Sequence, residues 1–422
     1  MKRINTIRWA VVVLWLLLPC SVVGHGQVVA IKAGKLVDPE TGTTSVKQVI
    51  IVEGRRIKAI GQNLPIPTGA QVVDLSNATV LPGLFDAHQH LCMTIIKERD
   101  NANYFFTTLL DTSASRAIQG VANAREMLES GFTTVRDVGN AGNYVDTDLR
   151  RSIQRGLVPG PTIINAGRII APYGGQFHLQ PERRDLGNPE YSYADTRDEL
   201  KKAIRENIHY GALVIKIVVD DQRYIYSEDD IRFIVEEAGR SGLKVAAHCW
   251  TEQGARNAAA AGVASIEHGF VMSDATLELA KKNNVALVGT EFPEALLQAL
   301  GVPNAAGEHK NWVDRLRRAF KVGVTLVYGT DAAVGLKEQT RGVQAISFIE
   351  SYIEAGVPPK TILQALTVNA ARLLGVEKDR GAIKPGMYAD IIATPENPLD
   401  NIRTLKQVSF VMKDGKVFKK PS

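Results

Sequence analysis

Six side chains of types that bind metal ions lie in or directly after five short apolar runs of this chain. Residues 81–90 (LPGLFDAHQH) carry the first two, His88 and His90. Side chains alternate between the two faces of a strand, so this pair points one way and can chelate one ion. The other runs, 213–219, 244–248, 265–268 and 326–331, carry Lys216, His248, His268 and Asp331. Four histidines, a lysine and an aspartate in this order indicate the two-metal centre of a hydrolase.

Lys216 has the most informative surroundings of the six. It lies inside the apolar run VIKIVV, residues 214–219, where an ammonium group is costly to bury. Burial lowers the pKa of a lysine and makes the neutral amine available. That amine can take up carbon dioxide to form a carbamate (N6-carboxylysine), an anion able to bridge two cations. The alternative is a lysine at a strand end whose ammonium group reaches water.

Strand-like and helical runs alternate between residues 81 and 385. Eight strands alternating with helices predict an α/β fold of the (β/α)8 barrel (TIM barrel) type, whose functional residues lie at the C-terminal ends of the strands. The candidate ligands fall at such ends, which disfavours the alternative of an open, doubly wound sheet. The strands are expected to begin near residues 84, 133, 162, 213, 244, 265, 286 and 325, and the helical runs cover 114–129, 195–210, 227–241, 251–261, 274–283 and 312–322.

Both ends of the chain contain short strand-like runs. They occupy residues 28–75 and 389–418, and Asp414-Gly415 between two such runs is a hairpin signal. Neither end can bury an apolar face alone, so we expect the two to pair into a small β-sandwich domain. The predicted organisation is a signal peptide at 1–24, the β-domain at 25–80 and 386–422, and the hydrolase barrel at 81–385.

The first residues have the pattern of an export signal. Lys2, Arg3 and Arg8 precede the apolar run 9–18, and small residues follow up to Gly24. An apolar stretch of about 10 residues is too short to span a bilayer, which needs roughly 20. We therefore expect a cleaved signal, a periplasmic or secreted enzyme and no stable membrane association, the alternative being an uncleaved anchor.

Composition narrows the range of partners. The net charge is +5, but the basic residues are scattered along the chain, which argues against nucleic-acid binding. Of the three cysteines, Cys20 leaves with the signal, and Cys92 and Cys249 are expected to be buried free thiols rather than a disulfide framework. His209 and His309 are expected in solvent. We expect a small-molecule amide as the substrate and a homo-oligomer as the assembly.

These segments resemble the amidohydrolase superfamily, and more closely its branch of prolidase-like dipeptidases and imidazolonepropionase-related proteins. The resemblance covers nearly the whole chain after the signal. It is carried by 81–90, by 131–137 (GFTTVRD), by 380–390 (RGAIKPGMYAD) and by the lysine, histidine and aspartate positions above. True imidazolonepropionases lack the bridging lysine and use one metal, so Lys216 argues against that activity.

The resemblance implies a specific division of the ligands. His88, His90 and Asp331 would hold one divalent ion, His248 and His268 the second, and carboxylated Lys216 would bridge the two. Zinc suits these ligand types best, with manganese or cobalt as alternatives.

The predicted reaction follows from such a centre. Two cations sharing a water molecule make hydroxide available near neutral pH, and one of them polarises the scissile carbonyl. Asp331, the predicted catalytic residue, would take a proton and pass it to the leaving nitrogen. We expect hydrolysis of an amide bond in a dipeptide or an N-acyl amino acid, with a cyclic or aromatic xenobiotic amide as the alternative. Two further alternatives, a non-catalytic scaffold and a solute-binding protein, fit the full ligand set poorly.

Two positions are candidates for selecting the substrate near the proposed ligands. Trp250 lies two residues after His248, so it faces the same side and is expected to wall the pocket. Prolidase-like relatives are expected to carry a tyrosine there, and the tryptophan favours a flat or aromatic group instead. His178 ends the glycine-rich segment 171–178, in which Gln176 stands where relatives have the histidine of a Gly-Gly-His; it is a substrate ligand or an ordinary loop residue.

Two more residues are substrate-binding candidates. Arg136, at the end of the second strand, is expected to bind a carboxylate or merely to pair with Asp137. Tyr224, after the fourth strand, borders the pocket or packs in the core.

Overall fold

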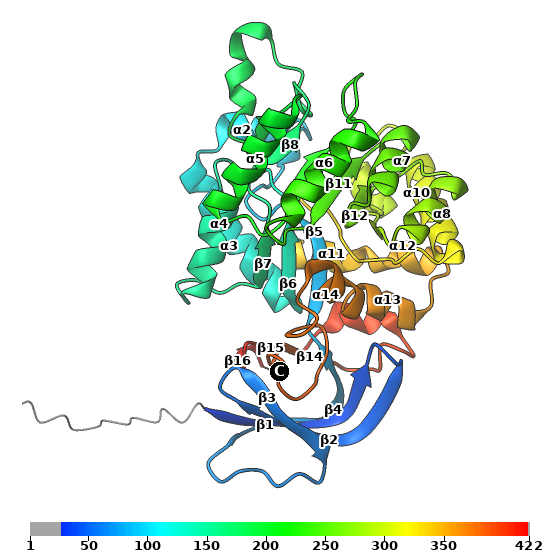
Figure 1. Cartoon of the computed structure of the whole chain (residues 1–422). Helices are drawn as coiled ribbons and strands as arrows, with labels where there is room; N and C mark the ends of the chain where they lie inside the picture. The colour runs from blue at the N-terminus through cyan, green and yellow to red at the C-terminus, as the bar shows by residue number, and fades with distance from the viewer. Residues whose placement is uncertain (1–26, 421–422) are drawn as a thin grey trace, which may run out of the picture.

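The computed structural model describes residues 27–420 and has a barrel joined to a β-domain (Figure 1). The barrel strands form parallel pairs in two sheets, β5-β6-β7 and β13-β12-β11-β10-β8-β9. The strands are β5 (Leu84–Gln89), β6 (Phe132–Asp137), β7 (Thr162–Asn165), β8 (Ile169–Ala171), β9 (Tyr191–Tyr193), β10 (Ile215–Val218), β11 (Val245–Cys249), β12 (Ser265–His268) and β13 (Ala286–Val288). The mixed α/β barrel expected from the sequence is therefore confirmed.

Two of the eight strand positions differ from regular strands. β7 pairs with β6 and β8 pairs with β10, so the third position is divided between two short strands. The eighth position, predicted to be a strand from Thr325, has only an isolated bridge at Leu326. Its amides bond to different neighbours, that of Val327 to Leu287 and that of Tyr328 to Ala365, which prevents one continuous ladder but still closes the barrel.

Helices cover the outside of the barrel (Figure 1). Several begin at a side-chain cap, as at Thr196, Ser227 and Thr251, and several end at a left-handed glycine such as Gly211 or Gly262. The helices are α1 (Lys97–Asp100), α2 (Phe105–Leu110), α3 (Ser113–Glu129), α4 (Val145–Gln154), α5 (Arg197–Tyr210), α6 (Glu228–Gly239), α7 (Glu252–Ala261), α8 (Asp274–Lys282), α9 (Glu294–Leu300), α10 (Ala305–Val322), α11 (Arg341–Ser347), α12 (Ile349–Glu354), α13 (Pro359–Ala365) and α14 (Val368–Leu374), with short 3-10 turns at Pro181–Gly187 and Ile402–Gln407.

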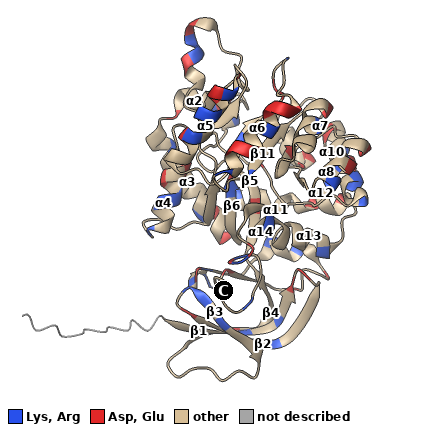
Figure 2. Cartoon of the chain, in the orientation of Figure 1, with Lys and Arg blue, Asp and Glu red and all other residues tan. Residues whose placement is uncertain are grey.

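Helix α10 begins earlier than the sequence pattern predicts. It therefore contains His309, whose ring nitrogens bond to the carbonyl of Phe292 at 2.8 Å and to Glu354 at 2.7 Å. The expectation that His309 is solvated is wrong, because the ring packs between two elements. His209, on α5, is exposed as expected. Basic and acidic residues are interspersed over these helices (Figure 2).

The β-domain combines strands from both ends of the chain. Its sheet has the order β16-β15-β14-β4-β1-β2-β3, so β4 links the N-terminal strands to the C-terminal ones. These strands form one continuous sheet around their own apolar core, where the prediction was a sandwich of two sheets. The strands are β1 (Val28–Asp38), β2 (Thr43–Glu53), β3 (Arg56–Gln62), β4 (Gln71–Pro82), β14 (Ile391–Thr394), β15 (Phe410–Lys413) and β16 (Lys416–Lys419).

Cys92 and Cys249 are buried and unpaired. The predicted signal peptide lies outside the described residues. Within residues 27–420, no helix has the length and apolar character needed to cross a bilayer.

Candidate metal centre

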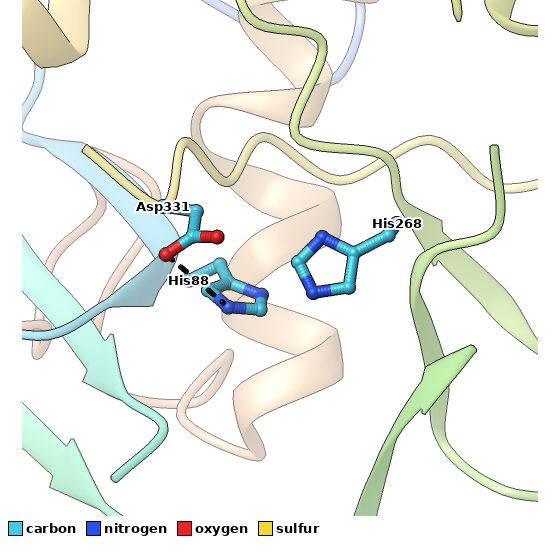
Figure 3. Close-up of side chains that lie close together, drawn as sticks. All are labelled: His88, His268 and Asp331. Atoms are coloured by element: carbon cyan, nitrogen blue, oxygen red, sulfur yellow. Dashed lines mark ion pairs between the residues drawn. The ribbon is translucent and has the colours of Figure 1, made fainter. Parts of the chain in front are cut away.

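The structure brings all six candidate ligands to one cavity of about 270 Å³ at the C-terminal ends of the barrel strands. Figure 3 shows three of them, with His88 and Asp331 facing His268 across the barrel mouth. The ligands come from β5 (His88, and His90 just after it), β10 (Lys216), β11 (His248), β12 (His268) and the end of the eighth position (Asp331).

The side chains are close enough to share cations. Oδ1 of Asp331 lies 3.3 Å from Nε2 of His90 and 3.9 Å from Nε2 of His88. The ring centres of His248 and His268 are 4.5 Å apart, and those of His88 and His268 are 4.9 Å apart. Ligand atoms of His88, His268 and Asp331 all lie within 4.8 Å of one another. Nε2 of His88 is buried and has no hydrogen-bond partner, as expected of a metal-binding atom.

Each histidine is oriented by a hydrogen bond from one ring nitrogen. Such bonds fix the tautomer and leave the other nitrogen for a metal ion. The partners are Glu267 for Nδ1 of His88 at 2.7 Å, the Gly139 carbonyl for Nδ1 of His90 at 2.7 Å, Thr290 for Nδ1 of His268 at 2.8 Å, and Asp221 for Nε2 of His248 at 3.0 Å.

Two ligand candidates have left-handed backbone conformations. The φ angle is 65° at His268 and 56° at Asp331, and neither residue is a glycine. Such a conformation costs about 1–3 kcal/mol and is typical of functional sites. Each is the last residue of its strand position, so the turn directs the side chain into the cavity.

Burial sets the protonation of the site. Burial lowers the pKa of His88 to about 4 and the pKa of His268 well below its ordinary value, so both rings are neutral at pH 7. Burial also lowers the pKa of Lys216 to about 8. Although burial opposes it, the contacts with His90 and His88 lower the pKa of Asp331 to about 2. Neutral imidazoles and an ionised carboxylate are the forms that bind divalent ions, and the lowered pKa of Lys216 favours the neutral amine that takes up carbon dioxide.

A buried ion pair lies beneath His88. Glu267 accepts hydrogen bonds from Arg136 at 2.7 Å and from Ser265, and Arg136 also donates to Ser265 at 2.9 Å and to the Ala87 carbonyl at 2.5 Å. Arg136 is 2% exposed and does not line the cavity. The predicted contact between Arg136 and a substrate carboxylate is therefore not supported, and neither is its pairing with Asp137, because Glu267 is its partner.

A second network joins β5 to the eighth position. Asp86 accepts hydrogen bonds from Gln89 at 2.7 Å and from the hydroxyl of Thr330, 2.6 Å away. It also accepts from the Thr330 amide at 3.1 Å, next to Asp331. Burial raises the pKa of Asp86 to about 6. These hydrogen bonds fix the position of Asp331 relative to His88 and His90.

An aromatic wall forms one side of the cavity. Phe270 stacks on Trp312 with centroids 3.9 Å apart and planes 12° apart, and Trp250 lies 4.9 Å from Phe270. Trp250 lines the cavity at its rim and is 44% exposed. Phe270 was missed from the sequence, although it follows His268 at the same two-residue spacing that singled out Trp250. Phe292 and the α9 residues Leu297 and Leu300 extend the wall.

The remaining substrate candidates lie outside the cavity. His178 is exposed, and the hydroxyl of Tyr224 donates to the Tyr173 carbonyl. Neither lines the cavity, because the loops that carry them turn outward after β8 and β10. The predicted substrate-binding roles of His178 and Tyr224 are therefore not supported.

Gln176 reaches the cavity instead of His178. It donates to Asp221 at 2.5 Å and accepts from Tyr191 at 2.7 Å. Asp221 in turn bonds to His248, so this loop contributes to holding a ligand candidate. Tyr104 and Asn140 also line this side. The sequence carried no signal for Asp221 or Tyr104, because their contacts join segments far apart in the chain.

Asp220 lies next to the site but has a structural role. Its carboxylate accepts hydrogen bonds from the amides of Trp250 and Thr251 at 2.8 and 2.7 Å and from the Thr251 hydroxyl. These bonds hold the start of α7 and, with it, the backbone of Trp250.

Known proteins are similar to this chain over most of its length. Residues 79–418 match the model of the amidohydrolase family. An ochratoxinase from Aspergillus niger is 28% identical over 440 residues, covering 94% of this chain and 88% of that protein. An imidazolonepropionase from Deinococcus deserti is 26% identical over 356 residues, covering 79% of this chain and 82% of that protein. The solved structure of a Xaa-Pro dipeptidase with bound methionine matches with a TM-score of 0.83 and 29% identity, covering 93% of this chain and all of that one.

Proposed function

Since the chain belongs to the amidohydrolase family, a class of metal-dependent hydrolases, we propose that it is an exported enzyme that cleaves a peptide-type amide bond with two divalent ions. One observation carries this proposal. Four histidines present one ring nitrogen each to the same cavity as Lys216 and Asp331, and each is held by a hydrogen bond from its other nitrogen. A scaffold without catalytic activity has no need of this arrangement.

The residues fit a two-metal centre with zinc as the preferred ion. His88, His90 and Asp331 would hold one ion, and His248 with His268 the other. Lys216 would bridge them as N6-carboxylysine, and its lowered pKa supports that modification. When bound, two such ions supply a hydroxide nucleophile at neutral pH and polarise the substrate carbonyl.

The protein's own residues handle the proton. Asp331 is ionised at neutral pH because His90 and His88 lower its pKa to about 2, so it accepts a proton from the attacking water. It then returns this proton to the leaving nitrogen as the C–N bond breaks. The buried imidazoles of His88 and His268 stay neutral, because burial lowers their pKa.

The substrate class has two candidates. Dipeptides and N-acyl amino acids follow from the branch that the chain resembles, which includes a Xaa-Pro dipeptidase. A cyclic or aromatic amide is favoured by the aromatic wall of the cavity and by the similarity to an ochratoxinase. Export to the periplasm or the medium rests on the N-terminal pattern alone.

Substrate profiling tests the proposal. Purified enzyme loaded with zinc is offered a mixed library of dipeptides, N-acyl amino acids and aryl amides, with and without chelator, and products are identified by mass spectrometry. We expect chelator-sensitive amide cleavage and two metal ions per chain. His88→Asn should abolish both, whereas His209→Asn, at an exposed position on α5, should change neither. Cleavage that survives full metal removal would contradict the proposal.

A further inference from the structure

The cavity contains almost no positive charge from side chains. Apart from Lys216, no lysine or arginine among residues 27–420 lines it. Lys216 itself lies among the proposed metal ligands and becomes an anion if it is carboxylated. A dipeptide or an N-acyl amino acid would bring a carboxylate into this cavity, and a recognition site for a carboxylate normally offers a guanidinium or ammonium group.

The arginines buried in the barrel are already engaged by the protein. Arg136 pairs with Glu267 at 2.7 Å, and Arg315 pairs with Glu291 at 2.8 Å. Arg116 pairs with Glu190. Arg341 donates to backbone carbonyl oxygens, including that of Met93 at 2.7 Å. All four are at most 3% exposed, so none can turn to a ligand without breaking a buried pair or bond.

The side of the cavity beside His248 and His268 is apolar and aromatic. Phe270 and Trp312 form a stacked back wall, Trp250 forms the rim, and Leu297 and Leu300 of α9 complete it. A charged group placed there would lose its hydration without gaining a partner. The polar groups opposite, Tyr104, Asn140 and Gln176, are neutral and suit an uncharged carbonyl or amide.

We propose that the substrates of this site are electrically neutral amides with an aromatic or bulky apolar group beside the scissile bond. This inference rests on the proposed amide hydrolysis and specifies the substrate class of that reaction. Water adds its hydroxyl to the acyl carbon and its proton to the nitrogen, and both products leave as a carboxylic acid and an amine. A free carboxylate on the uncleaved part of the substrate weakens binding.

Matched compounds in which a carboxamide replaces a carboxylate test the proposal, with cleavage measured at the acyl–nitrogen bond that both members of a pair share. The set is N-acetylphenylalaninamide with N-acetylphenylalanine, N-acetylalaninamide with N-acetylalanine, and benzoylglycinamide with benzoylglycine, so that the ring lies on either side of the bond. For the zinc-loaded full chain, kcat/KM of each neutral compound should exceed that of its acid about tenfold or more. The kcat/KM values of the phenylalanine pair should exceed those of the alanine pair by a similar factor.

Variants of the wall separate the two parts of the proposal. Trp250→Leu, at the half-exposed rim, should lower the preference for phenylalanine over alanine about fivefold. Leu300→Arg should raise kcat/KM of the acids relative to the amides, because it supplies the missing cation. Val343→Arg adds the same charge on the exposed surface of α11 and should leave the preference unchanged.

An acid that is hydrolysed as well as its amide, or better, would overturn the inference while leaving the proposed reaction intact. If the wild type prefers the acids and Arg223→Ala loses this preference, the carboxylate ligand is Arg223, in the exposed loop after β10. That result would also overturn the inference. If none of the compounds is cleaved by enzyme that holds two metal ions, the proposed reaction fails for this set. Calorimetric binding of the same pairs then decides the inference, with tighter binding of the acids overturning it.

Discussion

The Glu267 carboxylate lies between Arg136 and His88, 2.7 Å from Nη2 of the first and 2.7 Å from Nδ1 of the second. All three side chains are at most 2% exposed. Burial raises the pKa of Glu267, but Arg136 and His88 outweigh this effect and hold the pKa far below its ordinary value. The carboxylate is therefore ionised, and it fixes the His88 tautomer whose Nε2 points into the cavity.

Glu267→Gln should weaken metal binding and stability together. A carboxamide cannot neutralise Arg136, and an uncompensated buried charge costs about 3–5 kcal/mol of unfolding free energy. Loss of the carboxylate partner of His88 should lower metal affinity about 10- to 100-fold. Chelator-competition titration and denaturant unfolding measure the two effects. Glu278→Gln, at an exposed position on α8, is the control, and unchanged metal affinity in Glu267→Gln would show that His88 is oriented by other groups.

Thr330→Val should disturb the site without removing a ligand. The Thr330 hydroxyl donates to Asp86, and its oxygen accepts from Gln89, 2.6 Å from each. Valine has the same shape but leaves Asp86 and Gln89 with one bond fewer each, at a cost of about 1–3 kcal/mol of stability. Asp331, the next residue, should then be less well positioned, so kcat should fall more than metal content. Thr68→Val, in an exposed turn, should change neither stability nor kcat. A wild-type kcat in Thr330→Val would rule out a role of Thr330 in positioning Asp331.

Much of the site was predictable because strand periodicity makes it local. His88 and His90 point into one cavity because they are two positions apart in an extended segment. The run around Lys216 indicated burial, which the structure shows at 2% exposure. The same rule places Trp250 on the side of His248. Positions at strand ends also follow from the barrel, in which the C-terminal ends of all strands meet.

The contacts that were missed join segments distant in sequence. The partner of Arg136 is Glu267, 131 residues away, and Gln176 meets Asp221, 45 residues away. No local pattern encodes such pairs. His178 and Tyr224 were misplaced because the direction of a loop depends on its own turns, here with left-handed Gly174 and Gly175. The irregular eighth position likewise follows from tertiary hydrogen bonds.

Metal loading should depend on carbon dioxide through Lys216. Burial lowers the pKa of Lys216 to about 8. The fraction of Lys216 in the reactive neutral form therefore increases as the pH rises toward 8 and then levels off. About a tenth of the amine is neutral at pH 7, and an exposed lysine has far less. At fixed dissolved carbon dioxide, the rate of reactivation of metal-free enzyme by zinc should rise about tenfold from pH 6 to pH 7 and little above pH 8.5.

The matching variant is Lys216→Glu, which supplies a carboxylate of different length without carboxylation. Its reactivation should lose the dependence on carbon dioxide, even where some metal binding returns. Lys310→Glu, at an exposed position on α10, should reactivate like the wild type. A wild-type rate that is independent of carbon dioxide would argue against the carbamate.

Gln176→Leu should lower kcat while leaving metal content nearly unchanged. The Gln176 amide donates to Oδ2 of Asp221, whose Oδ1 lies 3.0 Å from Nε2 of His248. Without this donor the Asp221 carboxylate gains freedom to rotate, and His248 loses the fixed orientation of its second nitrogen. Because Asp221 still carries its charge, the ions should stay bound. We expect kcat to fall about tenfold, as for removal of a partner in the outer shell of a metal site.

The control is Gln180→Leu, exposed on the same loop. Restored activity in Gln176→Asn or Gln176→His would show that this position needs a hydrogen-bond donor. Loss of metal in step with kcat would instead assign Gln176 a role in binding the ions.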